Sequence, residues 1–289
     1  MTQFLQVCIS GLMLGLVLAL MASGLNLIYG VFDVLNIAHG EFMFGGAMVS
    51  WFLWDVFGMN PVLTVPFAAI SMFGAGVLMH ICLIERVFKE STVVSLILLF
   101  GVSIAVQGLA IKFISINPKT ISFYEGSIQL GSILIPRSRL AASLVALPSL
   151  GLAHVFLKYT KHGVATKATA QNAEIAESCG INVRKVRYLT TGIAAALAGV
   201  AGSATIMVLP INPQSGYRFA ITAFIVAIVG GLGSFYGSIV AAILMAVGQN
   251  LLAWKTDQML ADALIYILLL GVLLFRPSGL AGLLKSKAR

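Results

Sequence analysis

Long apolar runs are the feature that most limits how this chain of 289 residues can fold. The first 32 residues carry no charged side chain, and residues 4–29 suffice to cross a bilayer, which takes about 20 mostly apolar residues. Polar residues or glycines interrupt some of the eight further runs, which lie at residues 31–54, 61–84, 92–114, 140–157, 188–209, 219–232, 237–254 and 260–275. The sequence therefore predicts an all-α, polytopic transmembrane helix bundle of eight to ten spans with broken or re-entrant segments, in one domain over residues 1–289.

The composition agrees with a chain that lies largely in lipid. Hydrophobic residues make up 59% of it and charged residues 10%, against roughly 25% charged in a soluble domain. Such a chain has too few charges to cover a water-facing surface, which excludes a soluble enzyme, a disordered chain and a nucleic-acid binder. The cysteines Cys8, Cys82 and Cys179 are widely separated and form no CxxC motif, so we expect reduced packing residues and no metal site.

Basic residues gather in a few loops, which predicts the orientation of the chain. With nine spans, one side holds 12 of the 18 Lys and Arg residues: Arg86, Lys89, Lys158, Lys161, Lys167, Arg184, Lys185, Arg187, Arg276, Lys285, Lys287 and Arg289. The opposite side holds Lys119, Arg137, Arg139, Arg218 and Lys255. The positive-inside rule therefore places the C-terminus in the cytoplasm and the N-terminus outside the membrane.

The longest polar stretch, residues 158–187, contains a short segment with the signals of a capped helix. Asn172 is a good N-cap, Glu174 suits the positive end of the helix dipole, and Gly180 suits a left-handed residue past the last turn. Ile175 and Cys179 lie four apart and would share one face. A capped helix with an apolar stripe in a cytosolic loop indicates a docking element, although it could instead lie on the lipid surface.

A second polar segment lies between two strongly apolar runs and includes Asp33, Asn36, His39 and Glu41. Polar groups at membrane depth are tolerated where they are buried in protein or line a wet cavity. One interpretation is a broken helix beside a solute path lined by Asn36, His39, Glu41 and the earlier Asn26. The other is a helix start at the cytoplasmic interface, with Glu41 paired to a basic loop residue. His39 and Glu41 lie on opposite sides of one turn, which disfavours a metal site.

Glycines cluster near the end of the chain, at Gly230, Gly231, Gly233 and Gly237. We expect a tight turn that breaks the helix, since no strand precedes the cluster and no Lys-Ser/Thr follows it, as a phosphate loop would need. Gly11 and Gly15 form a GxxxG spacing that allows close helix packing. Gln107, Gln249 and Asn250 are polar residues inside apolar runs. We expect them to form hydrogen bonds between helices, with contact to a solute as the alternative.

Four motifs in order resemble one transporter family. They are Asn36-Ile-Ala-His-Gly-Glu41, the segment at residues 170–182, Ala223-Phe with Gly230-Gly-Leu-Gly-Ser and Gly237, and Phe275-Arg-Pro-Ser-Gly-Leu280. Together they resemble the LivH-like permeases of branched-chain amino-acid ABC importers. The resemblance implies a second related permease, two cytoplasmic ATPase subunits that bind ATP and Mg, and a periplasmic solute-binding protein. It implies no cofactor in this chain, and a solute that is a branched-chain amino acid, urea, an amide or an aromatic acid.

The same resemblance implies how the ATPase subunits would engage the chain. Coupling loops of ABC importers often carry E-A-A-x-x-x-G, and Glu174, Ala176 and Gly180 keep that pattern whereas Ile175 departs from it. The expected coupling residues are Asn172, Glu174, Ile175, Ala176, Gly180 and Ile181. No Walker A motif occurs in the chain, so another chain must bind ATP if ATP drives transport.

Two other classes of function compete with this one. An ion- or proton-coupled secondary transporter needs carboxylates inside the membrane, for which Glu41, Asp33 and Asp262 are the candidates. An intramembrane enzyme needs a nucleophile or a metal cluster, and neither HExxH nor GxSxG occurs in the sequence. We therefore expect a transport subunit without catalytic residues.

Overall fold

Helices form nearly all of the computed structural model, which describes residues 2–32, 34, 36–87, 92–131, 133–275 and 279–280. A π-helical turn, η1, interrupts one helix, and a two-stranded antiparallel hairpin, β1–β2, precedes another. The elements are α1 (Thr2–Phe32), α2 (His39–Phe57), α3 (Pro61–Met79), η1 (His80–Ile84), α4 (Glu85–Val87), α5 (Thr92–Phe113), β1 (Ser127–Leu130), β2 (Ile133–Pro136), α6 (Arg137–Tyr159), α7 (Lys161–Gln171), α8 (Ala173–Ser178), α9 (Val183–Ile206), α10 (Ser215–Gly230), α11 (Phe235–Lys255) and α12 (Gln258–Phe275).

Each of the nine predicted apolar runs contains a helix, which confirms the all-α polytopic class. Seven helices in the described part of the chain are long and apolar enough to cross a membrane: Thr2–Phe32, Pro61–Val87, Val93–Phe113, Arg137–Tyr159, Val183–Ile206, Phe235–Lys255 and Gln258–Phe275. That is fewer than the eight to ten expected. The run at 31–54 is divided, because α1 continues to Phe32 and α2 begins at His39 with polar residues in its first turn. Helix α10 is apolar but has only 16 residues.

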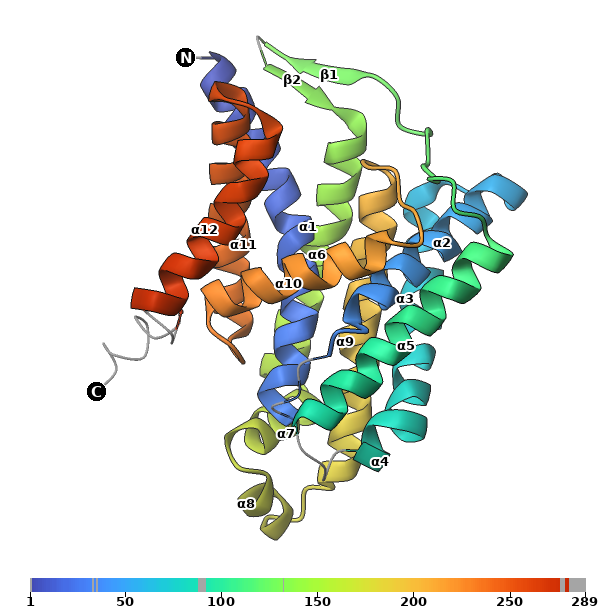
Figure 1. Cartoon of the computed structure of the whole chain (residues 1–289), viewed down its shortest axis with the longest axis vertical. Coiled ribbons are helices and arrows are strands. Elements are labelled where there is room, and N and C mark those ends of the chain that lie inside the picture. The colour runs from blue at the N-terminus through green and yellow to red at the C-terminus, as the bar shows by residue number, and fades with distance from the viewer. Residues whose placement is uncertain are drawn as a thin grey trace.

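The long helices run between two opposite ends of the molecule (Figure 1). The N-terminus and the β1–β2 hairpin lie at one, which we call the hairpin end. Helices α4, α7 and α8 lie at the other, which we call the α8 end. Helix α10 differs from the long helices because it crosses the middle of the molecule in this view rather than running between the ends.

Small residues let the helices approach closely. A Cβ atom added to Gly11 would lie 2.8 Å from the Cα of Val247, and one added to Gly15 would lie 2.9 Å from the Cα of Ile243. The predicted GxxxG spacing therefore forms the seam between α1 and α11. Glycines are useful here because lipid supplies little hydrophobic force to join helices, so close van der Waals packing carries more of the association.

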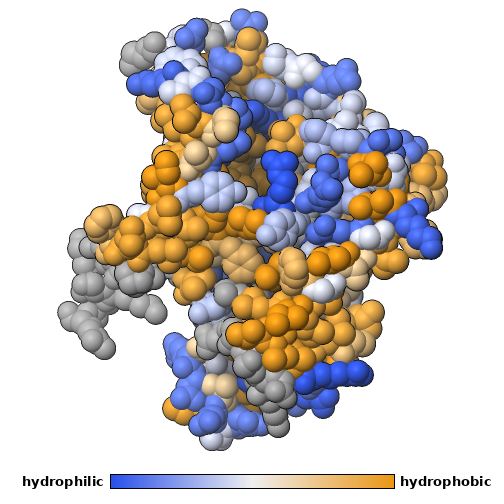
Figure 2. All heavy atoms as spheres, viewed as in Figure 1, coloured by the Kyte–Doolittle hydropathy of each residue, from blue (hydrophilic) through white to orange (hydrophobic). Residues whose placement is uncertain are grey.

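The surface is as apolar as a lipid-facing surface should be. Large side chains such as Ile70, Ile97, Leu152 and Leu274 are between 67% and 77% exposed. Figure 2 shows hydrophobic side chains across the middle of one face and hydrophilic ones at its lower end and over much of its upper part. In contrast, several polar side chains are buried inside the bundle. This distribution supports a bundle that exposes its apolar side chains to lipid.

Basic residues separate between the two ends as the sequence predicted. Elements at or beside the α8 end carry Arg86, Lys158, Lys161, Lys167, Arg184, Lys185 and Arg187. Elements at or near the hairpin end carry Arg137, Arg139 and Lys255, whereas Arg218 lies on α10, which crosses the middle of the molecule. The other basic residues counted on the cytoplasmic side, Lys89, Arg276, Lys285, Lys287 and Arg289, lie outside the described residues, as does Asp33.

Candidate functional site

Helix α8 is capped as its sequence predicts. The backbone N–H of Ile175 donates to the side-chain oxygen of Asn172 at 3.0 Å. Gly180 has a φ of 84°, a conformation that glycine adopts without strain. The N–H of Ile181 then donates to the carbonyl of Ala176 at 3.1 Å, which closes the last turn. These local bonds fix a helix of only six residues that would be marginal alone.

One side of α8 packs against the chain and the other is free. Ala176 is 3% exposed, whereas Ile175 is 62% exposed. Glu174 and Cys179 are also exposed, and Ile181 is half-buried. The stripe predicted from the spacing of Ile175 and Cys179 therefore faces away from the bundle. An exposed apolar stripe at a polar end of the molecule is suited to contact a partner.

The α8 end is tied to two of the long helices. Arg184, in the first turn of α9, forms an ion pair with Glu85 of α4, in which Nη2 donates to Oε2 at 3.1 Å. Deeper in the bundle, Nδ1 of His80 in η1 lies 2.9 Å from the hydroxyl of Thr191 in α9. These contacts join the start of α9 to the end of the segment that contains α3.

The glycine-rich segment forms the predicted tight turn, between α10 and α11. Gly231 and Gly233 have φ values of 98° and 75°, which most side chains would strain. A Cβ on Gly230 would lie 2.6 Å from the carbonyl carbon of Gly237, so the two helix ends nearly touch. The four predicted glycines thus serve the turn and its close packing.

Asn26 of α1 holds this turn from inside the bundle. Its amide nitrogen donates to the carbonyls of Gly231 and Ser234, both at 3.2 Å, and also to the hydroxyl of Ser238. Its amide oxygen accepts from the N–H of Gly233 at 3.1 Å. Asn26 is 1% exposed and is fully engaged with protein atoms. These contacts favour a role in holding helices together over one in lining a path.

Glu41 lies inside the bundle and contacts α5. It is 6% exposed, and Oε1 accepts from the hydroxyl of Ser103 at 2.7 Å and from the amide of Gln107 at 2.9 Å. The expectation that Glu41 pairs with a basic loop residue is wrong, because α2 begins inside the bundle. The prediction that Gln107 bonds between helices is confirmed. Glu41 also packs against α10, since a Cβ on Gly216 would lie 2.5 Å from Oε2.

Asn36 and His39 are the most deeply buried of the predicted path residues. Both are 0% exposed, and Nε2 of His39 lies 3.1 Å from the carbonyl oxygen of Met21. Within the described residues, four buried polar atoms of the motif have no hydrogen-bond partner: both amide atoms of Asn36, Nδ1 of His39 and Oε2 of Glu41. His39 thus lies against α1 and Glu41 against α5 and α10, and Asn36, His39 and Glu41 are not among the residues that line the cavity described next.

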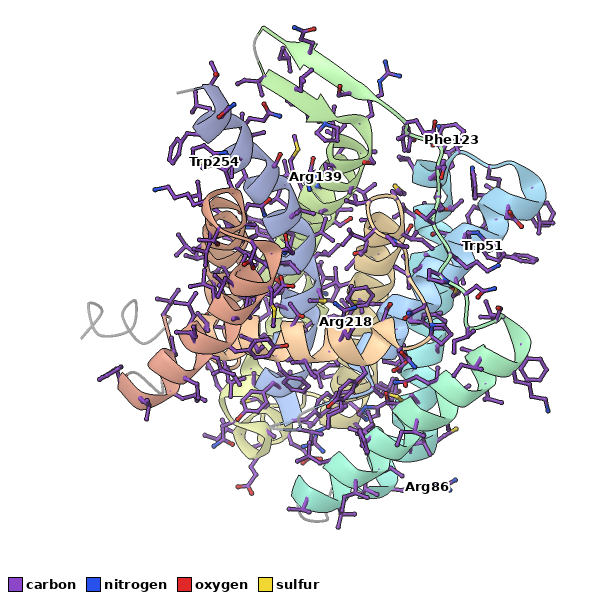
Figure 3. The ribbon with its side chains drawn as sticks, turned by 45° about the horizontal axis from the view of Figure 1, so that its top comes forward. Trp51, Arg86, Phe123, Arg139, Arg218 and Trp254 are labelled. Carbon is purple, nitrogen blue, oxygen red and sulfur yellow. The ribbon has the colours of Figure 1, made fainter. Side chains whose placement is uncertain are left out.

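A large open space lies elsewhere, on the hairpin side of α10. A cavity of about 570 Å³, open on one side, is lined by α1, α2, α6, α9, α10, α11 and α12. Its polar lining comes from Arg139, Thr205, Arg218, Thr222, Gln249, Asn250, Gln258 and Asp262. Figure 2 shows the face hollowed above α10, and Figure 3 labels Arg139 at the upper end of α6 and Arg218 on α10.

Sequence reasoning missed this convergence. Arg139 and Arg218 counted only as basic residues of the outer side, and Asp262 only as a possible proton relay. Gln249 and Asn250 were noted for hydrogen bonds between helices or contacts with a solute. The signal that could have found the site is the charge of Arg218 and Asp262 beside or within apolar runs, because charges are costly there and tend to face cavities.

Comparisons with known proteins agree with this architecture. The family described as "Branched-chain amino acid transport system / permease component" matches residues 7–273. The permease protein BraD of a high-affinity branched-chain amino acid transport system in Pseudomonas aeruginosa is 29% identical, with 96% of each chain covered. The corresponding LivH protein of Escherichia coli K12 is 28% identical, again with 96% of each chain covered.

A more distant relative is LivM of Escherichia coli K12, also a permease protein of a branched-chain amino acid transport system. It is 26% identical over 92% of this chain and 68% of LivM. No solved structure matches the chain. The family match covers nearly the whole sequence, including every residue that lines the cavity. The chain therefore belongs to the family of permease components of branched-chain amino acid transport systems.

Proposed function

We propose that this permease subunit of an ABC importer moves a branched-chain amino acid, or a related small polar solute, inward across the bacterial inner membrane. The names of its relatives support the solute class. The observation that carries the coupling part is α8, a capped helix whose Ile175 is 62% exposed at the basic end of the bundle. The chain itself has no Walker A motif, so another subunit must bind the ATP if ATP drives transport.

The proposed assembly has four kinds of subunit. A second permease pairs with this one, as the similarity to both LivH and LivM proteins suggests. Two ATPase subunits, which bind ATP and Mg, dock at the α8 end in the cytoplasm, and a periplasmic binding protein delivers solute at the hairpin end. The C-terminus is cytoplasmic in this orientation, because basic residues favour the inner side. We expect the chain itself to be a transport subunit and not an enzyme.

The proposed mechanism transmits motion through α8. When ATP closes the ATPase subunits, they displace Ile175 and the rest of α8. The ion pair between Arg184 and Glu85 and the contact between His80 and Thr191 carry that displacement into α9 and the α3 segment. Moving a two-state population from 1:99 to 99:1 takes about 5.5 kcal/mol, which must come from tighter binding of nucleotide to one state.

The test uses substitutions on α8 in the assembled importer. The double variant Ile175→Glu with Glu174→Arg alters the exposed face of α8. We expect the complex of two permeases and two ATPase subunits to assemble, while solute-stimulated ATPase activity and uptake are lost. A matched control is Ile175→Leu with Glu174→Asp, which changes the same two positions but keeps the apolar and acidic character of the exposed face. Normal coupled transport in the α8 variant would refute the proposal.

The rival function is an ion- or proton-coupled secondary transporter, which the buried carboxylate of Glu41 favours. In that case this chain alone, reconstituted in liposomes, would take up solute, and an uncoupler would abolish the uptake. ABC transport predicts no uptake without the ATPase subunits and ATP. The same vesicles therefore distinguish the two mechanisms.

A further inference from the structure

The cavity on the hairpin side of α10 combines charges of both signs with an apolar wall. Arg139 and Arg218 contribute positive charge and Asp262 negative charge. The apolar part of the lining comes from Leu14, Val17, Leu18, Val208, Ile221 and Ile265. A cavity of about 570 Å³ is within the range of small-molecule sites, which are typically apolar with a few placed polar groups.

The charged side chains that line this cavity do not form ion pairs with one another. Among the described residues the ion pair is Arg184 with Glu85, at the far end of the bundle. The side chains of Arg139 and Arg218 make no hydrogen bond or ion pair within that same part of the chain. Oδ1 of Asp262 accepts from the amides of Gln249 and Gln258, at 2.6 and 2.8 Å. The carboxylate is thereby oriented without being neutralised.

We propose that this cavity receives a free zwitterionic α-amino acid. The guanidinium groups of Arg139 and Arg218 hold the carboxylate, which they can bind through paired N–H donors. Asp262, held by its two glutamines, takes the ammonium group. The apolar wall takes an aliphatic side chain. The inference rests on the proposed function and adds the site within this subunit where the solute is held.

Helix α10 forms one wall of the site, and its movement provides a way to release the solute. It crosses the bundle below the cavity, and its residue Arg218 is part of the cavity lining (Figures 1 and 3). Its N-terminal part packs on α2 through Gly216 and Glu41, and its C-terminal end is held by Asn26. A shift of α10 would therefore move one arginine relative to the other and weaken the grip on the carboxylate.

The test measures amino-acid binding without the binding protein. The complex of this chain with its partner permease and ATPase subunits is placed in nanodiscs and trapped with ATP and vanadate, and [3H]leucine is the probe. We expect Arg139→Gln, Arg218→Gln and Asp262→Asn each to weaken binding by roughly tenfold or more, because each removes one charge-assisted contact. Matched controls are Arg137→Gln and Asp257→Asn, which lie near the same positions but outside the cavity lining.

Selectivity provides a readout that a merely structural role would not change. Leucinamide lacks the carboxylate charge, so wild type should prefer leucine, and the two arginine variants should lose much of that preference. If all three variants bind leucine like wild type, or if the trapped wild type binds no leucine, the inference is refuted. Failure of the proposed function is seen separately, because wild type would then show no ATPase stimulation by the loaded binding protein.

Discussion

Replacing Asn26 with Leu should destabilise the fold by removing the hydrogen bonds that the Asn26 side chain makes to the turn between α10 and α11. The side chain is 1% exposed, whereas one of its partners, Gly233, lies in an exposed part of the turn. Asn26→Leu keeps the volume similar and removes every polar contact. Asn26→Asp keeps an acceptor for the N–H of Gly233 but directs a second oxygen at the carbonyls of Gly231 and Ser234.

The magnitude follows from which groups are left unpaired. The carbonyl of Gly231 still accepts from the N–H of Ser234 at 3.0 Å, and the carbonyl of Ser234 still accepts from the N–H of Ser238 at 3.1 Å. The N–H of Gly233 has no such second partner among the described residues. An unpaired donor costs about 1–3 kcal/mol when it is buried, and the exposure of Gly233 places this loss near the lower end, at about 1 kcal/mol. We expect that loss for Asn26→Leu and a larger one for Asn26→Asp.

Equilibrium unfolding of the purified permease in mixed detergent micelles, followed by tryptophan fluorescence, measures this difference. The control is Asn117→Leu, because Asn117 is exposed in a loop and should change the free energy of unfolding little. If Asn26→Leu is as stable as wild type, these hydrogen bonds contribute nothing and the reasoning from unpaired groups is wrong. If Asn26→Asp is the milder change, the assigned orientation of the amide is wrong.

Two further predictions concern packing and coupling. Gly202→Val should abolish folded, monodisperse protein in size-exclusion chromatography, because a Cβ there would collide with the backbone of Met43 in α2; Gly101→Val, with open space around its Cα, should not. Reversing one charge of the Arg184–Glu85 pair should lower solute-stimulated ATPase activity, and Arg184→Glu combined with Glu85→Arg should restore much of it. A double variant no better than the single ones would show that the pair does not transmit motion.

Local patterns made most of the helices predictable. Length and apolarity are properties of contiguous residues, so each of the nine runs could be found without knowledge of the fold. The caps of α8 are equally local, since Asn172 and Gly180 act on neighbouring backbone groups. Helix α7 and the β1–β2 hairpin were not predicted, because their residues carry weaker periodic signals.

Long-range contacts were the part that the sequence could not provide. Asn26 reaches residues more than 200 positions later, and nothing near Asn26 indicates its partners. One of the two interpretations of Glu41 had it meet a basic residue at an interface, but it meets Ser103 and Gln107 inside the bundle. The cavity residues come from separate helices, and only the crossing of α10 brings Arg218 onto the same cavity as Arg139.

Cross-linking at Ile175 tests the central claim most directly. In a variant that lacks Cys8, Cys82 and Cys179, the change Ile175→Cys places a thiol on the exposed face of α8. We predict that a short bifunctional maleimide joins this thiol to an ATPase subunit in the assembled importer, with a yield that changes when ATP is added. A thiol that reacts only with an impermeant reagent outside the cell, and never joins an ATPase subunit, would contradict the claim.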